Sequence, residues 1–352
     1  MSERMTGRVM VTEAWDVAVT DDSQVHGAAA AASAAALAAG LDPNDLATCE
    51  LLATELATNL VRHAVDGRLL VNVFGRGAVQ LVAVDRGPGI PDVAASLTDG
   101  FTTSSSLGAG LGACRRGAAQ FDLYSRVGQG TVALARVGPA AAQPAGSVEV
   151  GGLISPHPDE SAVGDGFGLA WDGDRMTVGV VDGLGHGVKA AEARSAALDL
   201  LERQPALDSA GLLSEIDLGL RVTRGAAAAI AQIDGWSRRL SFAGMGNVTG
   251  RLFRPGTDQA LVSRPGILGA GHGPQVATRT RSHSVVSADW RAPAVLILHT
   301  DGITSRWNLA DYPRADHHHP AILAALIWRD ALRGNDDATV VVVRTAPENG
   351  SR

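Results

Sequence analysis

A stretch of proline, alanine and glycine near the middle of the chain separates two parts of domain size. The stretch GPAAAQPAGS, Gly138 to Ser147, has no hydrophobic period and lies between the strand-like segments TVALARV and VEVGGLIS. The chain has 352 residues, of which 45% are hydrophobic, so each part can bury a core of its own. We therefore predict an N-terminal domain over residues 1–138, a linker over 139–147 and a C-terminal domain over 148–352.

Charge and composition exclude several classes of protein. The net charge is -7 and no long basic run occurs, so a nucleic-acid partner is not expected. The alanine-rich stretch 27–40 is too short and too weakly hydrophobic to span a membrane, and the N-terminus lacks the apolar core of a signal peptide. Cys49 and Cys114 lie far apart and outside any paired motif, which fits a reducing compartment. We expect a soluble cytoplasmic protein without a membrane partner.

Hydrophobic patterning predicts an α+β fold for both parts. In the first part, strand-like segments at 8–20, 68–75, 78–87, 122–127 and 131–137 alternate with helical segments at 27–40, 42–65 and from about 110. This order predicts one mixed sheet with helices on one face. In the second part, strands precede and follow two helices at 188–204 and 209–225, which predicts a β-sandwich flanked by helices. The segment 306–320 has no clean period, and we interpret its three histidines as a solvated surface.

A polar stripe marks the predicted helix at 42–65. Glu55, Asn59 and His63 are spaced four residues apart and therefore lie on one side of the helix among leucines. An amide oxygen is a hard ligand for Mg²⁺, and a carboxylate one turn away can accept a proton from a hydroxyl group. On this helix alone, a solvated polar face explains the pattern equally well.

Two glycine-rich segments follow this helix. In VDRGPGIPD, Asp85 ends a strand before Gly87 and Gly89, so its carboxylate could accept from an adenine amine, although a plain turn gives the same pattern. In FTTSSSLGAGLGACRRG, glycines at the start of a helix offer backbone amides to phosphate. This segment lacks the ending of a P-loop and opens no βαβ unit, so neither a P-loop nor a dinucleotide-binding fold is expected.

Together, the three blocks resemble the N, G1 and G2 boxes of the GHKL (Bergerat-fold) ATPases. They are most similar to the RsbT/RsbW-like serine kinases that act as anti-sigma factors and stress-switch kinases. The resemblance covers residues 10 to 137, including the closing pair Gly130 and Thr131. It implies that ATP and Mg²⁺ are bound, that Glu55 is the general base, that Asn59 binds Mg²⁺ and that Asp85 contacts adenine. The remaining implied nucleotide contacts are His63, Gly87, Gly89, Thr103, Gly108, Gly110, Leu111, Gly112 and Thr131.

Sensor histidine kinases share these boxes but need a preceding dimerisation helix that carries the phosphoacceptor histidine. The ten or so residues before the first predicted strand leave no room for such a helix. We therefore expect the phosphoacceptor to be a serine or threonine of another protein.

Acidic residues recur at the edges of strand-like segments in the second part. They are Asp165, Asp182, Asp301 and the pair Asp336-Asp337. Asp165, Asp182 and Asp301 are each followed by Gly. One Asp beside Gly at a strand end is ordinary turn chemistry, but four acidic positions at strand edges are harder to explain in this way. Buried carboxylates that converge repel one another unless cations neutralise them, and oxygen ligands suit Mg²⁺ or Mn²⁺. Two such ions can activate a water for attack on a phosphate.

The order GD, DGLGHG, TDG and DDAT resembles the metal-dependent PPM-type serine/threonine phosphatases, in their SpoIIE-like (RsbX-like) branch. The resemblance covers residues 148 to 345 and implies the αββα sandwich of that family. It implies two Mn²⁺ or Mg²⁺ ions bound by Asp165, Asp182, the carbonyl of Gly183, Asp301 and Asp336. Asp336 is preferred to Asp337, and His186 is expected to follow the metal loop without binding the ions.

The two resemblances predict a bifunctional partner-switching regulator. The N-terminal domain would phosphorylate, and the C-terminal domain dephosphorylate, a STAS-domain antagonist of the stressosome or anti-anti-sigma type, with a sigma factor or another output protein downstream. Two alternatives remain open. The N-terminal domain could bind nucleotide and a partner without turnover, or ATP could gate a phosphatase that is the only enzyme. The presence of both Glu55 and Asn59 favours catalysis, because a pure binder needs no base.

Overall fold

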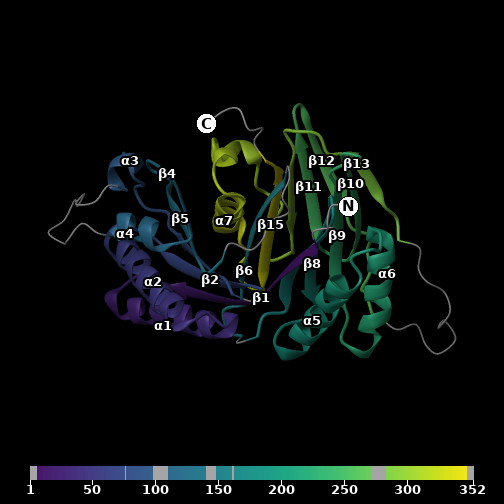
Figure 1. Ribbon diagram of the computed structural model, residues 1–352, viewed down its shortest axis with the longest axis horizontal. Helices are drawn as coiled ribbons and strands as arrows, with labels where there is room; N and C mark the ends of the chain where they lie inside the picture. The colour runs from purple at the N-terminus through teal and green to yellow at the C-terminus, as the bar shows by residue number, and fades with distance from the viewer. Residues whose placement is uncertain are drawn as a thin grey trace. The chain divides into compact units, whose positions relative to one another are not determined.

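The computed structural model describes residues 6–75, 77–97, 110–139, 148–160, 162–270 and 283–346 (Figure 1). The chain forms two compact units. The N-terminal unit comprises Glu13–Ala141 and Arg306–Ala331, and the C-terminal unit comprises Met1–Thr12, Ala142–Ser305 and Leu332–Arg352. These units do not coincide with the ranges 1–138 and 148–352, because contacts assign the first twelve residues and residues 306–331 to the opposite unit. We call residues 306–331 the inserted segment.

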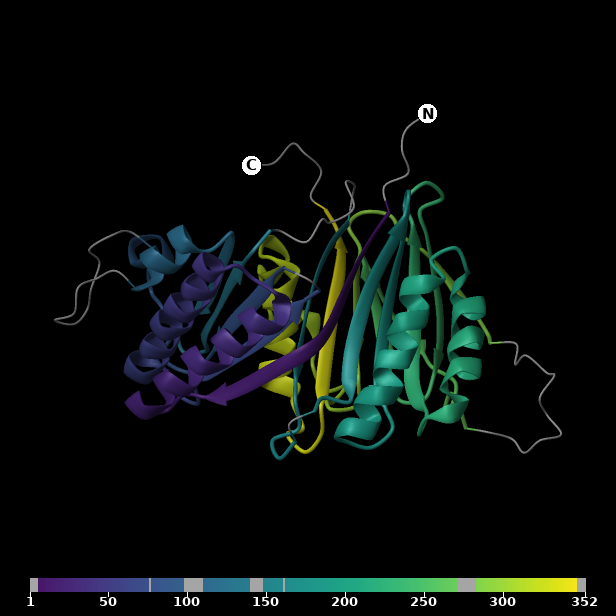
Figure 2. The ribbon, with the colours of Figure 1, turned by 60° about the horizontal axis from the view of Figure 1, so that its bottom comes forward.

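The N-terminal unit is an antiparallel sheet with two long helices against it. Its strands are the second half of β1 (Thr6–Ala18), then β2 (Arg68–Phe74), β3 (Val79–Val84), β5 (Gly130–Val137) and β4 (Gln120–Arg126), in this spatial order. The helices are α1 (Asp22–Ala39), α2 (Pro43–His63), the short α3 (Val93–Ser96) and α4 (Gly110–Gly117). Helices α1 and α2 pack against each other and against β2 and β3 (Figures 1 and 2). The predicted arrangement of one sheet with helices against it is confirmed, but the strand pairs β2–β3, β3–β5 and β4–β5 are antiparallel and not mixed.

The two long helices follow from local sequence signals. The Asp21 side chain caps α1 in a reciprocal capping box with Gln24, and α1 ends at Gly40 in the left-handed conformation. Six alanines form the buried face of α1, which lets α2 approach closely. Asp42 caps α2 through the backbone N–H groups of residues 44 and 45, with Pro43 in the first turn.

The C-terminal unit is a sandwich of two antiparallel sheets. One sheet has the order β13 (Val286–Asp289), β10 (Arg239–Met245), β9 (Ala226–Asp234), β8 (Arg175–Gly183), β7 (Asp165–Asp172) and the first half of β1. The other has the order β12 (Thr257–Val262), β11 (Thr249–Arg254), β14 (Val295–His299), β15 (Ala338–Thr345) and β6 (Val148–Ser155). Helix α5 (Val188–Arg203) packs on β7 and β8, and α6 (Ser209–Gly219) packs on β9 and β10 (Figure 2).

The inserted segment contains two 3₁₀ turns, η2 (Leu309–Asp311) and η3 (Ala315–His317), followed by α7 (Pro320–Ala331). Helix α7 was not predicted, because it is apolar on every side and so has no amphipathic period. Ten of its twelve residues are buried. Within the N-terminal unit it packs against β3, β4 and β5 (Figure 1). It therefore contributes to the core of a unit whose other helices and strands all lie before Ala141 in the sequence.

The three adjacent histidines are not simply a solvated surface. His318 Nδ1 lies 2.8 Å from Asp122 Oδ1, and the backbone N–H of His319 donates to Asp122 Oδ2 at 2.5 Å. The His318 ring also meets the Tyr124 ring edge to face, at 5.4 Å between centroids. Only His317 is exposed. That interpretation was wrong for two of the three residues, because Asp122 on β4 binds them.

Candidate active sites

The start of α4 lies against the polar stripe of α2. A methyl group added at Gly110 would stand 3.2 Å from Asn59 Oδ1 and 3.6 Å from Glu55 Oε2. A side chain at residue 110 would therefore crowd the space beside this amide and this carboxylate. Asn59 Nδ2 is buried and has no hydrogen-bond partner among the described residues. Because a buried polar atom without a partner is costly, this amide fits a site whose ligand supplies the partner.

Asp85 directly follows β3 and begins a tightly built turn. Its Oδ1 accepts from the backbone N–H of Gly87 at 2.6 Å, and its own N–H donates to the Thr131 carbonyl at 3.0 Å. A side chain at Gly87 would come within 2.8 Å of the His63 carbonyl, and one at Gly130 would overlap the Asp85 carbonyl. Burial raises the pKa of Asp85, partly offset by these backbone hydrogen bonds. The turn thus joins the end of α2 to β3 and β5.

The other predicted nucleotide contacts lie around these two features. His63 is exposed at the last position of α2, and Thr131 Oγ1 lies 2.9 Å from Ser125 Oγ. Gly89 has a φ of +72° and lies against the Arg126 carbonyl, where a side chain would overlap. Leu111 and Gly112 lie in α4, half-buried and buried respectively. Thr103 and Gly108 lie outside the described residues.

In the C-terminal unit, Asp165 and Asp182 are directly opposite each other in the antiparallel register of β7 and β8. Asp165 is 1% exposed, and its Oδ2 accepts from Thr300 Oγ1 at 2.7 Å. Burial, followed by the charges of Asp182 and Asp337, raises the pKa of Asp165 well above its usual range. Burial and the charge of Asp301 raise the pKa of Asp182 to about 7. These carboxylates therefore lie close enough to repel one another.

The remaining acidic residues come from the other sheet. Asp301 follows β14 and Asp336 precedes β15, and these strands are antiparallel neighbours with His299 opposite Val340. Burial raises the pKa of Asp336, and the charge of Asp301 adds to this shift. The sandwich therefore brings to one place residues from both sheets that are far apart in sequence.

Asp337 differs from its neighbour Asp336. It is 3% exposed, and its two oxygens accept backbone N–H groups of His157 and Gly164, each at 2.6 Å. Both oxygens are thus used in fastening two loops. The Asp336 carboxylate is half-buried and, among the described residues, accepts only from the N–H of Asp337, at 2.9 Å. This arrangement leaves Asp336 better suited than Asp337 to bind an ion.

Two glycines let the backbone approach this place closely. The Gly183 N–H donates to the Gly164 carbonyl at 3.0 Å, and a side chain at Gly183 would overlap the carbonyl of Ala190 on α5. A side chain at Gly302 would overlap the Asp337 carbonyl. Within the described ranges, no three His, Cys, Asp or Glu side chains gather into a ready-made metal cluster. To bind a shared cation, the carboxylates would have to turn toward one another. Their acidic oxygens and mutual repulsion fit a hard divalent ion.

Sequence reasoning missed several residues around these aspartates. Asn247 hydrogen-bonds Asp182 and lowers its pKa against the larger effect of burial. His186 Nδ1 lies 2.5 Å from Glu160 Oε1, and the His157 ring stacks on the His186 ring at 5.6 Å. Asn247 belongs to the motif FAGMGNV, and this motif could have identified Asn247 as a site residue. Nothing in the sequence links Glu160 to His186, because only the fold brings their loops together.

Comparison with known families agrees with this geometry. Residues 18–136 match the family model "Histidine kinase-like ATPase domain", and residues 172–346 match "Stage II sporulation protein E (SpoIIE)". No helix within the described part of the chain is long and apolar enough to cross a membrane.

Two relatives and a crystal structure of one of them are informative. Serine/threonine-protein kinase RsbT of Bacillus subtilis (strain 168) is 37% identical over 95 residues, covering 26% of this chain and 71% of RsbT. Phosphoserine phosphatase RsbX of the same organism is 28% identical over 144 residues, covering 41% of this chain and 69% of RsbX. A crystal structure of RsbX in complex with magnesium has a TM-score of 0.50 at 21% identity, over 57% of this chain and 96% of that one.

A structure from a study of the bacterial stressosome as a modular system controlling secondary messenger signalling has a TM-score of 0.51. It is 24% identical and covers 56% of this chain and 99% of that one. At these identities, the two solved structures show the fold alone. The predicted GHKL-type and PPM-type folds are confirmed. The chain therefore belongs to the RsbT family of histidine kinase-like ATPase domains through its N-terminal part, and it is an enzyme of the SpoIIE-type (PPM) serine/threonine phosphatase class through its C-terminal part.

Proposed function

We propose that the chain is a bifunctional partner-switching regulator that phosphorylates and dephosphorylates serine or threonine on a STAS-domain protein. The observation that carries the proposal is that one chain contains two separate groups of candidate site residues. Glu55 and Asn59 lie beside Gly110 in one unit, and the facing pair of buried Asp165 and half-buried Asp182 lies in the other. The similarity to both RsbT and RsbX supports it, since these are a kinase and a phosphatase by name.

In the phosphatase reaction, Asp165, Asp182, the Gly183 carbonyl, Asp301 and Asp336 would hold two Mn²⁺ or Mg²⁺ ions. Such ions supply Lewis acidity and a water of lowered pKa for attack on a phosphate ester. Thr300 fixes Asp165 by its hydrogen bond, and Asp337 fastens the loops at His157 and Gly164. These contacts would fix the positions of the site residues and leave the metal-binding carboxylates free to bind the ions.

In the kinase reaction, Glu55 would accept the proton of the attacking serine or threonine hydroxyl. The hydroxyl oxygen forms a bond to the γ-phosphorus while the bond to the β-phosphate oxygen breaks, so ADP is the leaving group. Asn59 would bind Mg²⁺ through its amide oxygen, and Asp85 would accept from the adenine amine. The glycines of both segments let the backbone approach the nucleotide.

We propose a STAS-domain protein of the stressosome or anti-anti-sigma type as substrate, with a sigma factor or another output protein downstream. The structural similarity to a protein from the stressosome study supports this choice. Cys49 and Cys114 are free and buried, which agrees with the predicted cytoplasmic location.

The test is a pair of assays on the full chain with a purified STAS-domain protein. With radiolabelled ATP and Mg²⁺, we expect label on the partner, and we expect Glu55→Gln to abolish this transfer while leaving phosphatase activity. With the phosphorylated partner and Mn²⁺, we expect phosphate release that Asp182→Asn abolishes. A wild-type chain that binds ATP but transfers no label would contradict the kinase half.

A second candidate is a phosphatase gated by ATP. It is favoured by one observation, namely that the inserted segment belongs to the N-terminal unit although its sequence lies between Asp301 and Asp336. In this case the wild-type chain would transfer no phosphate, and ATP would still change the rate of phosphate release.

A further inference from the structure

The inserted segment begins and ends beside the proposed metal-binding residues. It lies between Asp301 and Asp336 in sequence. Its two flanks are joined in the C-terminal unit, because Ile303 and Leu332 form an antiparallel bridge and the Arg333 N–H donates to the Gly302 carbonyl at 2.9 Å. Any displacement of the end of α7 therefore acts on residues next to Asp301 and Asp336.

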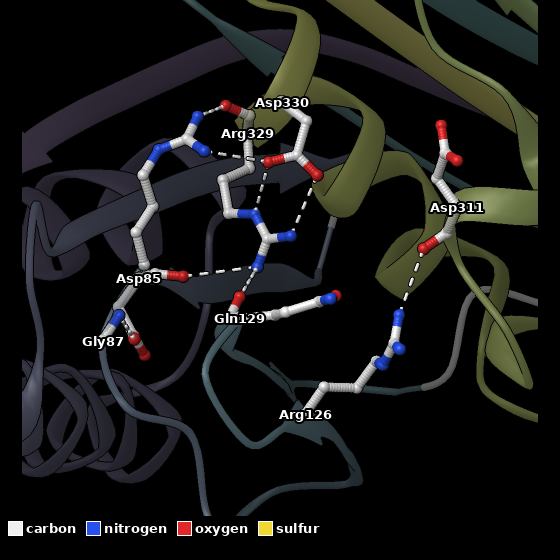
Figure 3. A network of polar contacts seen from close by, with 8 residues as sticks. Asp85, Gly87, Arg126, Gln129, Asp311, Arg329 and Asp330 are labelled. Atoms are coloured by element: carbon white, nitrogen blue, oxygen red, sulfur yellow. Dashed lines mark hydrogen bonds and ion pairs between the residues drawn. The ribbon is translucent and has the colours of Figure 1, made fainter.

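The end of α7 contacts the Asp85 turn (Figure 3). Arg329 Nη1 donates to the Gln129 carbonyl at 2.7 Å and to the Asp85 carbonyl at 3.4 Å. The Arg329 side chain is 10% exposed, and the Asp330 carboxylate holds it by hydrogen bonds at 2.8 and 2.9 Å. Arg86 completes the group, since its Nη1 lies 3.0 Å from Asp330 Oδ1 and its Nη2 donates to the Arg329 carbonyl.

These contacts make Arg329 a positioning residue for the turn. The guanidinium is planar and permanently charged, so it fixes two carbonyls at once. Asp85 is held by Arg329 through its main chain, and its side chain is the proposed acceptor for adenine. A nucleotide that reorders this turn must therefore act on Arg329, three residues before the point where α7 returns to the C-terminal unit.

The rest of the inserted segment is held elsewhere. Tyr124 Oη donates to the Pro313 carbonyl at 3.2 Å, Arg126 Nη1 donates to the Asp311 carbonyl at 3.3 Å, and His318 binds Asp122 (Figure 3 shows the Arg126 contact). These contacts attach the segment to β4 and not to the Asp85 turn. They provide a matched control for the contacts of Arg329.

We propose that the corner formed by Arg86, Arg329 and Asp330 couples nucleotide binding at Asp85 to divalent-cation binding at Asp301 and Asp336. The proposal rests on the proposed function of both sites and adds the way in which one regulates the other. Coupling between two binding sites is reciprocal, so each ligand changes the affinity for the other by the same factor. This reciprocity provides a readout that does not depend on catalysis.

The test uses the full chain, a fluorescent ADP derivative at constant saturating Mg²⁺, and Mn²⁺-dependent hydrolysis of p-nitrophenyl phosphate. In the wild type, we expect ADP to shift the half-saturating Mn²⁺ concentration by at least about fivefold, and Mn²⁺ to shift the Kd of the fluorescent ADP by the same factor. Asp182→Asn should abolish the effect of Mn²⁺ on ADP binding, which shows that the effect arises at the phosphatase site.

In Arg329→Gln, the fold-change in the half-saturating Mn²⁺ concentration and the fold-change in the Kd of ADP should both fall to about one. In Arg126→Gln, both should stay as in the wild type. If Arg329→Gln does not fold, as judged by thermal melting, Asp330→Asn replaces it, because it breaks the same corner while keeping the charge of Arg329. Unchanged titrations in a wild-type chain that binds ADP and hydrolyses the ester would overturn the coupling alone. Failure to bind ADP or to hydrolyse the ester would overturn the proposed function together with the coupling.

Discussion

Asp165 and Asp182 face each other across neighbouring strands, and burial raises the pKa of both. A carboxyl whose pKa is higher in the folded than in the unfolded protein binds a proton preferentially in the folded state. Its contribution to stability is therefore present at low pH and is lost as pH rises through the folded pKa. For Asp182 the window runs from its ordinary pKa of 3.8 to about 7.

We predict that the metal-free protein becomes less stable as pH rises from about 4 to about 7, by about 1.4 kcal/mol for each unit of pKa shift at most. Mn²⁺ should remove this loss, because the ion binds the deprotonated carboxylates. Thermal melting in EDTA and in Mn²⁺ across this range measures both effects. Asp182→Asn should make the profile in EDTA less steep, and an unchanged profile in this variant would contradict the assignment.

Asp336→Asn and Asp337→Asn should affect different properties of the protein: the first its metal-dependent activity, the second its stability. Because both Asp337 oxygens accept backbone N–H groups, an amide nitrogen there faces a donor, and we expect a loss of about 1–3 kcal/mol in the free energy of unfolding. Asp336→Asn should leave the stability of the metal-free protein within about 0.5 kcal/mol and remove Mn²⁺-dependent hydrolysis. Urea unfolding and a Mn²⁺ titration distinguish the two. A stable Asp337→Asn variant without activity would reverse our assignment.

Gly110→Ala should lower nucleotide affinity by at least about tenfold, which corresponds to 1.4 kcal/mol. The added methyl group occupies the space beside Asn59 and Glu55. Gly117→Ala is the matched control at the other end of α4, where the new methyl group meets the end of the Leu52 side chain at 3.3 Å and the Thr48 methyl group at 4.0 Å. Fluorescent ADP binding compares the two variants. Equal affinities would show that the space beside Gly110 is not part of the nucleotide site.

A fragment that ends at Pro139 should be less stable than the same residues in the full chain. It lacks α7, whose buried apolar side chains pack on β3, β4 and β5, so this face of the sheet becomes exposed. We expect the fragment to aggregate or to melt at a lower temperature. Adding a peptide of residues 306–331 should restore solubility or raise the melting temperature. A fragment as stable as the full chain would contradict the role of α7.

The sequence predicted those features that depend on local patterns. The cap at Asp42 and the leucines of α2 specify that helix and the stripe that carries Glu55 and Asn59. Each Asp-Gly pair at a strand end pointed to the second site, because the alternation of a strand and the turn after it can both be read locally. The individual roles of these residues stay predictions.

Features that depend on distant contacts could not be predicted in this way. Helix α7 lacks a polar side and therefore gives no period. The role of Arg329 cannot be predicted from the sequence, because it depends on contacts with the carbonyls of Asp85 and Gln129. The division of β1 also depends on a distant partner, since its residues 6–11 pair with β7.

The division of β1 and the position of the inserted segment affect how such a chain folds during synthesis and how its parts can recombine in evolution. The N-terminal unit is completed only after Ala331 has left the ribosome, when nearly all of the C-terminal unit has already been synthesised. The two units therefore finish folding together, late in translation. A recombination event at the linker would deprive one unit of a strand and the other of a helix. The ATPase-like part and the phosphatase part of such a chain would thus be inherited as a pair.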